Sequence, residues 1–387
     1  MRSNKRQISF QVSESAREHR LKSREKQNSL YHGYRFKHRG LVVFLSVFDL
    51  LLSLIPLPRR PLKGSARKIL LMKPDHFGDM LMLTSIFPLL KVRFPEAVLD
   101  VLCGSWSLAV LENNPQIRNR IVLNHPAYNR GRISLARKLL DFLRGVGHTL
   151  KVLHRERYDL CLNLRDAGGD LVLLARLGGC RHIIGHATGG CGPLLDTVVP
   201  WVEGCHEVEH YLELLRPLGI EASLADLHYE LFPSLADEAY VGRIIAEYRL
   251  GSFVVLHPGC GDKRKLRSSN FWAEVIAGID PALSVVVTGT NEEMALFAGI
   301  AGTSNRKIHA LFGELSIAQL FVLMRSAGAV YALDSLAAHL GAAAGVPTRV
   351  FWSDTNDPDQ WRPLGKEVNL CHSSEKSGAG ESGTDNN

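Results

Sequence analysis

The feature that most constrains the fold is an alternation of short apolar runs with amphipathic stretches, which occurs twice along the chain. In the first series, apolar runs of strand length lie at 68–73, 97–104, 158–164 and 182–186. In the second series they lie at 252–259, 283–290, 329–335 and 348–354. Apolar runs separated by stretches of helical spacing are typical of parallel sheets covered by helices on both faces. The sequence therefore predicts an α/β protein with two Rossmann-like domains that face a cleft.

A length of 387 residues also fits two domains better than one. We expect an N-terminal domain at 67–235 and a C-terminal domain at 250–368, joined by a linker that contains a helix. Residues 1–66 form a basic segment with an apolar helix, and 373–387 form a polar tail. Residues 1–38 contain few large apolar residues and many charges, and the tail is polar. Both segments are therefore predicted to be disordered.

The basic charge of the chain is concentrated at its beginning. Residues 1–68 contain 16 Lys/Arg and 4 Asp/Glu, whereas the rest contains 30 and 35, so the body is mildly acidic. This distribution favours an anionic membrane surface over nucleic acid as the partner of residues 1–60. The apolar run at 41–58 carries Asp49 in its middle, which argues for a helix in the membrane interface rather than across the bilayer. The alternative is a helix docked on the body.

Seven cysteines form no C-x-x-C pair, and an odd number fits a disulfide framework poorly. The sequence therefore predicts a reducing, cytoplasmic location, peripheral on the inner face of the cell membrane, and about forty polar residues before the apolar run argue against a cleaved signal peptide. One stretch does gather several possible zinc ligands, namely Cys180, His182, Cys191, Cys205, His206 and His210. Their spacing matches no compact zinc motif, so we expect no metal site.

Polar residues gather where the predicted strands end, and in parallel sheets ligands bind at that edge. They are Asp75 and Asp79 after the first strand, His257 with Lys263–Lys265 after the fifth, Thr288 to Glu292 after the sixth, and Asp334 with Ser335 after the seventh. The sequence therefore places the candidate site in the cleft, with contributions from both domains.

Five segments resemble the bacterial lipopolysaccharide heptosyltransferases, glycosyltransferase family nine, in the order that the family has them. They are "ILLMKPDHFGDMLMLTSIFPLLKVRFP", "RYDLCLNLRD" with "LLARLGGCRHIIGH", "HEVEHYLELLRPLGI", "VVLHPGCGDKRKLRSSNFWAEVI" and "LDSLAAHLGAAAGVPTRVFWSDTNDPDQWRP". The resemblance covers about residues 68 to 366. It implies a GT-B type fold that transfers a sugar, with inversion, from a nucleoside-diphosphate sugar in the C-terminal domain to a glycolipid or lipopolysaccharide-core acceptor in the N-terminal domain.

Asp79 matches the family's catalytic aspartate, which implies that it is the general base. Gly78 before it allows a tight turn between strand and helix. Asp75 either orients the acceptor or is itself the base. The structural alternative for Asp79 is a helix cap, a position that aspartate favours.

The resemblance places the donor on the C-terminal domain. The helix beginning near Ser335 offers backbone N–H groups to a diphosphate, and Lys263 or Lys265 adds positive charge. Asp334 fixes the turn or bonds a sugar hydroxyl, and His339 either packs or touches the donor. The remaining donor residues expected are His257 and Gly259 of the His-Pro-Gly strand, with Thr288, Gly289 and Glu292 around the nucleotide. A nucleoside-diphosphate sugar is the expected co-substrate, with ADP-heptose as one candidate, and the arrangement requires no metal ion or other cofactor.

The chain departs from the family in "DSLAAH", where Leu336 replaces the glycine that lets backbone approach phosphate. This substitution supports an alternative, a non-catalytic member that binds nucleotide sugar or glycolipid at the membrane. A dinucleotide-dependent dehydrogenase is disfavoured, because no G-x-G-x-x-G follows the first strand of either domain. Pro88 within the stretch 79–94 predicts a kinked helix there.

Overall fold

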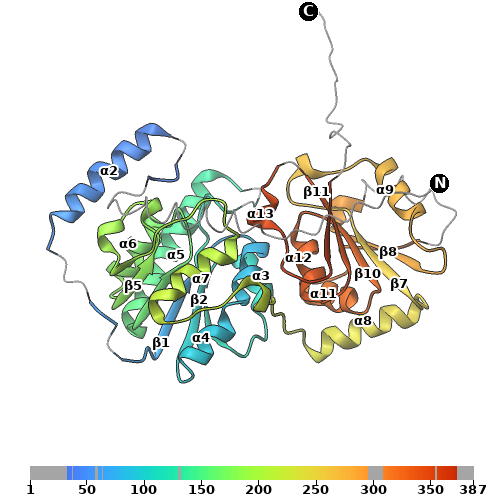
Figure 1. Cartoon of the computed structure of the whole chain (residues 1–387), viewed down its shortest axis with the longest axis horizontal. Coiled ribbons are helices and arrows are strands. Elements are labelled where there is room, and N and C mark those ends of the chain that lie inside the picture. The colour runs from blue at the N-terminus through green and yellow to red at the C-terminus, as the bar shows by residue number, and fades with distance from the viewer. Residues whose placement is uncertain are drawn as a thin grey trace, which may run out of the picture.

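Two six-stranded sheets form the cores of the two halves of the molecule (Figure 1). The computed structural model describes residues 33–372 apart from 37, 57–59, 63, 130, 132, 295–307 and 354. The first sheet is parallel and has the order β3-β2-β1-β4-β5-β6. Its strands are β1 (Lys68–Met72), β2 (Val98–Cys103), β3 (Ile117–Val122), β4 (Leu160–Asn163), β5 (His182–Gly185) and β6 (Thr197–Val198).

The second sheet is also parallel and has the order β12-β11-β10-β7-β8-β9. Its strands are β7 (Phe253–His257), β8 (Ser284–Gly289), β9 (Ile308–Phe312), β10 (Ala329–Leu333), β11 (Thr348–Trp352) and β12 (Val368–His372). Both halves thus have the connectivity of a Rossmann-like sheet, in which the strand order reverses between the first and fourth strands. The predicted α/β class with two Rossmann-like domains is confirmed. The second sheet extends four residues beyond the predicted boundary at 368, because β12 pairs with β11 up to His372.

Helices cover both faces of each sheet. One face of the first sheet packs against α3 (Phe77–Thr84), α4 (Phe87–Arg93) and α7 (Glu207–Leu215), and the other against α5 (Leu135–Glu156) and α6 (Gly169–Leu177). The second sheet packs against α9 (Ser269–Ala277) on one face and against α11 (Ile317–Arg325) and α12 (Leu336–Ala343) on the other. The linker helix α8 (Leu235–Glu247) joins the same apolar core as α3 and α12, so the two halves share one continuous core.

The helical stretch at 79–94 differs from its prediction. It is two helices rather than one kinked helix, since α3 ends at Thr84 and α4 starts at Phe87. Pro88 occupies the first turn of α4. Proline is tolerated there because the N–H groups of a first turn have no intrahelical acceptor. The break therefore precedes the proline and removes the predicted kink.

The apolar run near the N-terminus forms the helix α2 (Arg39–Ser53), at one end of the molecule in Figure 1. Asp49 of this helix is buried on its inner side. Its carboxylate accepts hydrogen bonds from the N–H of Cys191 at 2.7 Å and from the hydroxyl of Tyr34 at 3.0 Å. The helix is therefore docked on the N-terminal domain through its one carboxylate. Among the described residues, no helix is both long and apolar enough to cross a membrane.

The predicted disorder at 1–38 does not extend to residues 33–36. There the N–H of Arg35 donates to the carbonyl of Thr188 at 3.0 Å, and the Arg35 guanidinium lies 3.3 Å from the carboxylate of Asp166. The disorder predicted for 1–32 and 373–387 concerns residues outside those that the structure describes. The stretch 292–302, for which the sequence also predicts a helix, falls mostly outside them too, and a short 3-10 turn at Asn291–Glu293 is described at its start.

Candidate active site

The carboxyl ends of β1 and β4 meet where the strand order of the first sheet reverses. Lys73 and Asp75 follow β1, and Arg165 follows β4, so parallel pairing of these strands brings the three side chains together. The Asp75 carboxylate lies 3.1 Å from the ammonium of Lys73 and 3.1 Å from the guanidinium of Arg165. All three residues are buried. This edge of the sheet therefore holds a carboxylate between two cations.

Lys73 is the centre of this cluster. Its ammonium donates to the carboxylate of Glu207 at 2.7 Å and to the carbonyl of Leu164 at 3.1 Å, in addition to its ion pair with Asp75. Burial opposes the charge of Lys73, but Glu207, Tyr211 and Asp75 outweigh burial and raise the pKa of Lys73 well above its usual value. Lys73 is therefore a fixed cation within the domain.

Asp79 lies in the first turn of α3, directly after Gly78, which lies beside His339 of the C-terminal domain. Its side chain is partly exposed, and its carboxylate accepts a hydrogen bond from the backbone of His76. Burial raises the pKa of Asp79 to about 7, with further contributions from the negative charges of Asp75 and Glu207 and with Lys73 acting in the opposite direction. A carboxylate with a pKa near 7 suits proton transfer at neutral pH.

Asp75 has the opposite character. Burial alone would raise its pKa, but the adjacent charges of Lys73 and Arg165 outweigh burial and lower the pKa of Asp75. Its backbone carbonyl accepts hydrogen bonds from the Trp106 indole at 2.7 Å and the Ser107 hydroxyl at 2.8 Å, which fix the turn. The charged form of Asp75 is therefore favoured, and its backbone is held in place by two hydrogen bonds. Two neighbouring carboxylates with pKa values shifted in opposite directions are typical of a site that divides orienting and proton-transfer roles.

The second sheet carries its own lysine and aspartate at the reversal of strand order, after β7 and β10. Lys265 is buried and donates to the carboxylate of Asp334 at 2.6 Å and to its backbone carbonyl at 2.9 Å. The Ser353 hydroxyl donates to the same carboxylate at 3.1 Å. Burial raises the pKa of Asp334, against the effects of Lys265 and Ser353. Lys263, by contrast, is exposed, so the structure brings Lys265 and not Lys263 to this edge.

Ser335 begins α12 directly after Asp334. It is the N-cap residue, yet its side chain makes no capping bond, and its buried hydroxyl oxygen has no hydrogen-bond partner in the described part of the chain. The first turn of a helix also leaves backbone N–H groups available for an anion. Leu336, which follows, packs its partly buried side chain against the shared apolar core. The start of α12 therefore offers unused donors, and its leucine is directed at least partly toward the protein.

The residues expected around the nucleotide lie at the ends of β7 and β8. The His257 ring hydrogen-bonds to the hydroxyl of Thr288 at 2.9 Å, and burial lowers the pKa of His257. Glu293 rather than Glu292 packs against Gly259, where any side chain on residue 259 would collide with the Glu293 carboxylate. Gly289 is similarly close to Glu293 and to a phenylalanine ring. Glu292 itself is exposed, and the sequence analysis did not single out Glu293.

His339 lies between the two domains. A side-chain carbon at Gly78 would be 3.9 Å from the His339 ring, so the Gly-Asp turn of the first domain faces α12 of the second. The ring also contacts the hydroxyl of Tyr229 at 3.4 Å, and that hydroxyl accepts from the N–H of Leu364 at 3.0 Å. Burial lowers the pKa of His339 to about 3, so its ring is neutral at physiological pH. The domains are further joined by the His206 ring, 2.8 Å from the carbonyl of Arg362.

The structure thus brings most predicted residues together at two facing corners. The N-terminal corner lies at the ends of β1 and β4, and the C-terminal corner lies at the ends of β7, β8 and β10. Lys263 and Glu292 are left on the surface. The sequence did not single out Lys73, Arg165 or Glu207. Lys73 and Arg165 lie within two residues of the ends of β1 and β4, so the rule that placed Asp75 at this edge also pointed to them. Glu207 is 134 residues from Lys73, and its position at the start of a helix gave no sign of that ion pair.

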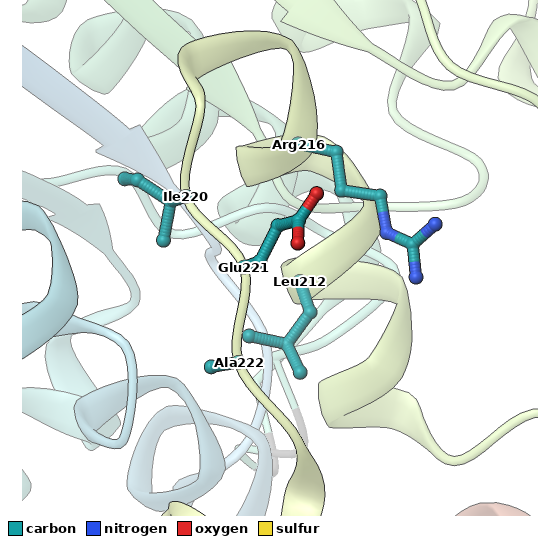
Figure 2. A pocket seen from close by; sticks show the side chains of 5 residues that line it. All are labelled: Leu212, Arg216, Ile220, Glu221 and Ala222. Carbon is teal, nitrogen blue, oxygen red and sulfur yellow. The ribbon is translucent and has the colours of Figure 1, made fainter.

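Two surface hollows lie apart from these corners. One, of about 400 Å³, surrounds the end of α7 and is lined by Leu212, Arg216, Ile220, Glu221 and Ala222 (Figure 2). The other, of about 530 Å³, is lined mainly by basic residues, including Arg60, Arg157 and Arg181. Neither includes a predicted site residue. Within the part of the chain that is described, no group of three His, Cys, Asp or Glu side chains is placed to hold a metal ion.

Solved structures with the same fold include members of the glycosyltransferase families. A glycosyl transferase family 9 protein from Veillonella parvula DSM 2008 superposes with a TM-score of 0.68 at 17% identity, covering 79% of this chain and 86% of that one. The E. coli ADP-heptose lipopolysaccharide heptosyltransferase II superposes with a TM-score of 0.62 at 21% identity, covering 80% and 92%. Two facing Rossmann-like domains of this kind define the GT-B type of glycosyltransferase fold.

The sequence comparisons identify the family. Residues 146–386 match the family described as glycosyltransferase family 9 (heptosyltransferase). Lipopolysaccharide heptosyltransferase 3 of Escherichia coli strain K12 is 27% identical over 304 residues, which cover 76% of this chain and 84% of that protein. The chain belongs to glycosyltransferase family 9 and is a glycosyltransferase.

Proposed function

We propose that this enzyme transfers a heptose-like sugar, with inversion, from a nucleoside-diphosphate sugar to a lipopolysaccharide-core or related glycolipid acceptor, with Asp79 as the general base. The observation that carries this proposal is the pair of carboxylates at one corner, with the pKa of Asp79 raised to about 7 and that of Asp75 lowered. ADP-heptose is the donor we favour, because one solved relative is an ADP-heptose lipopolysaccharide heptosyltransferase.

In this mechanism the Asp79 carboxylate accepts the proton of an acceptor hydroxyl. The hydroxyl oxygen then forms its bond to the anomeric carbon as the bond from that carbon to the diphosphate breaks, and a nucleoside diphosphate leaves. Asp75 stays charged between Lys73 and Arg165 and orients the acceptor by accepting hydrogen bonds from its hydroxyls. General-base catalysis of this kind contributes roughly 10²- to 10⁴-fold in rate.

The C-terminal corner binds the leaving diphosphate in this proposal. The Ser335 hydroxyl and the N–H groups that open α12 donate to its oxygens, and Lys265 supplies positive charge at the same edge. The nucleotide is framed by the ends of β7 and β8, with His257, Gly259, Thr288, Gly289 and the acidic turn that contains Glu292. Asp334 positions Lys265, and His339 packs as a neutral ring between the domains. The proposed chemistry needs no metal ion or other cofactor.

The acceptor in this proposal is lipid-linked, so the enzyme works at the inner face of the cell membrane, attached peripherally. The basic N-terminal segment supports this placement, because it favours anionic headgroups. Residues 1–60, including the docked helix α2, supply the attachment.

The alternative is a member that binds nucleotide sugar or glycolipid without catalysis. Leu336 favours it, because a side chain there replaces the family's glycine at the phosphate site. The packing of Leu336 on the apolar core weakens this objection, since the side chain is turned at least partly away from solvent.

One experiment separates the two. The purified full-length protein is incubated with a panel of nucleoside-diphosphate sugars that includes ADP-heptose, with lipopolysaccharide-core acceptors, and release of nucleoside diphosphate is measured. We expect acceptor-dependent release with ADP-heptose. Tight donor binding without release for any donor and acceptor pair would support the non-catalytic alternative and overturn our proposal.

A further inference from the structure

The helix α2 exposes an apolar surface on the side away from the protein. Its inner side chains Phe48 and Leu52 pack on the domain, and Phe44 stacks on Phe48 at 6.1 Å. Its outer side chains are from 52% to 72% exposed over most of the helix and the turn that follows it, namely Val43, Phe44, Val47, Leu50, Leu51, Leu54 and Ile55. Isolated exposed apolar residues are normal on a protein surface, but a contiguous stripe of this kind marks an interaction site.

The buried Asp49 fixes which side of α2 is turned outward. Its carboxylate is satisfied by the Cys191 N–H and the Tyr34 hydroxyl, both on the inner side of the helix. Rotating α2 to hide its outer leucines would remove both hydrogen bonds. The Asp49 carboxylate would then be buried without a partner or would have to move into solvent, and an unpaired buried charge is costly. The outward position of the apolar stripe is therefore imposed by the structure.

A second helix, α5, exposes leucines over its first half. Leu135, Leu139 and Leu143 recur every four residues on one side and are 74%, 49% and 58% exposed, and Leu140 beside them is 43% exposed. The second half of the same helix buries its apolar side chains normally, with Leu153 fully covered. The exposed leucines are thus confined to the end of α5 that lies nearer the loop carrying Tyr128, which contacts Arg165 of the candidate site.

The two helices lie on the same face of the first sheet. Phe48 and Leu52 of α2 and Phe142 and Val146 of α5 pack against one apolar cluster, which covers the face opposite α3 and α7. Helices that cover the same face of a sheet turn their outer sides away from it in the same general direction. The exposed stripes of α2 and α5 therefore face the same surroundings.

Basic residues border these stripes. Arg39 begins α2, and Arg137 and Arg144 lie among the exposed leucines of α5, with side chains 63% and 66% accessible. The acidic residues of the two helices are engaged with the protein: Asp49 is buried and Glu156 pairs with Lys68 at 3.2 Å. Asp141 is the exception, since it lies between Arg137 at 3.3 Å and Arg144 at 4.0 Å on the surface and offsets one of these two charges. An apolar stripe with a net positive border matches an anionic lipid interface.

We propose that the outer faces of α2 and α5 together form one bilayer-binding surface, which inserts its leucines among the acyl chains and places its arginines on anionic headgroups. The proposal extends the peripheral attachment in the proposed function, because it adds α5 and assigns the docked Asp49 a role in orientation. Charge favours this occupant over a second copy of the chain, since a symmetric dimer through this surface would oppose its own arginines. It also turns the α5 side of the candidate site toward the lipid.

The test uses the full-length protein and sedimentation with two kinds of vesicle, phosphatidylcholine alone and phosphatidylcholine with phosphatidylglycerol. We expect binding to the anionic vesicles, weakened by salt. The variants F44S/L51S and L139S/L143S should each lose at least tenfold in vesicle affinity. A matched control is V92S/L235S, two exposed apolar side chains on α4 and α8, 83% and 89% accessible, which should change affinity less than twofold. Thermal unfolding confirms that each variant is folded.

Several outcomes would overturn the proposal. Wild-type protein that does not bind anionic vesicles would exclude the surface, and loss only in the α2 variant would exclude α5 from it. A dimer that dissociates in both variants would instead assign the surface to a second copy. Vesicle binding is measured without sugar donor, and transfer is measured with a water-soluble core acceptor, so failure of this proposal is distinguishable from failure of the proposed catalysis.

Discussion

The two corners of the candidate site are built alike and behave differently. Each places a buried lysine on an aspartate where the strand order of a parallel sheet reverses. In the N-terminal corner Lys73 is shared by Asp75 and Glu207, and a third carboxylate, Asp79, lies nearby with its pKa raised to about 7. In the C-terminal corner Lys265 donates to the carboxylate and to the backbone carbonyl of Asp334, beside a helix start.

The difference lies in what each lysine leaves unsatisfied. Lys73 pairs with two carboxylates and also lowers the pKa of Asp79, but burial and the negative charges of Asp75 and Glu207 outweigh this effect. Lys265 fixes Asp334, and the Ser335 hydroxyl at that corner has no hydrogen-bond partner among the described residues. One corner therefore holds a proton acceptor and the other holds hydrogen-bond donors, as transfer to a hydroxyl with a departing phosphate requires.

The largest effect is expected from Asp79→Asn. The amide keeps the shape of the side chain but cannot accept the acceptor proton, so we expect kcat to fall about 10²- to 10⁴-fold. The dissociation constant for the nucleoside diphosphate should change less than twofold, because the donor binds at the other corner. Steady-state kinetics and calorimetry measure the two quantities. Unchanged turnover would exclude Asp79 as the base.

The same variant has a signature in stability. Because the folded state raises the pKa of Asp79 from 3.8 to about 7, this group stabilises the fold less and less as pH rises between those values. The Asp79→Asn variant does not lose stability in this way, because asparagine does not ionise. Its free energy of unfolding should exceed that of the parent at pH 8 and equal it at pH 4, which also proves that the inactive variant is folded.

The second prediction compares the two lysines. Lys73→Met leaves Glu207 buried with only the Tyr211 hydroxyl at 3.2 Å, and removing one partner of a buried ion pair costs about 3–5 kcal/mol. Lys265→Met also breaks a buried ion pair, but it leaves one carboxylate rather than two without a lysine, and Asp334 keeps its bond to Ser353, so this variant should cost less than Lys73→Met. Denaturant unfolding of both variants measures this difference. As a control, Lys73→Met/Glu207→Gln should recover at least half of the loss, and equal losses for the two lysines would contradict the comparison.

The third prediction concerns pH. Transfer needs Asp79 ionised, so kcat/KM should fall about tenfold for each pH unit below about 7 and be level above it. Glu207→Gln removes a negative charge that raises the pKa of Asp79, so this limb should move to lower pH. Asp75, whose pKa is lowered, should contribute no limb near neutrality. A pH–rate profile that is flat between pH 5 and 8 would refute the assignment.

The strands show how far the sequence determines the fold. The eight predicted strands are the four central strands of each sheet, and the four missed strands, β3, β6, β9 and β12, are the edges. Central parallel strands are covered on both faces and are continuously apolar, so periodicity reveals them. Edge strands face solvent and carry polar residues, as in β3, where three consecutive residues are exposed. Their pairing depends on the neighbouring strand, which local sequence does not specify.

The site divides in the same way. Residues that directly follow a strand, such as Asp75 and Asp334, could be placed from the sequence because the sheet fixes their edge. The choice between Lys263 and Lys265 could not be made, since burial within a three-residue turn decides it. The shifted pKa of Asp79 depends on Glu207, a residue of a different helix. Electrostatic tuning therefore came from contacts between distant segments, which no motif encodes.

The smallest effect is expected at the start of α12. In Ser335→Ala no intramolecular hydrogen bond is lost, because the hydroxyl has no partner in the described structure, so stability should change by less than about 0.5 kcal/mol. A bond from this hydroxyl to a charged phosphate contributes about 1.5–3 kcal/mol, so affinity for the nucleoside diphosphate should fall at least tenfold.

The matched control for this prediction is Ser353→Ala, which removes a hydroxyl bonded to Asp334. It should cost about 1 kcal/mol of stability and affect donor affinity less than Ser335→Ala does. Calorimetric titration and thermal unfolding of the two variants give both quantities. If Ser335→Ala destabilised the protein without weakening donor binding, its hydroxyl would serve the fold, and the C-terminal corner would present only backbone N–H groups and Lys265 to the phosphate.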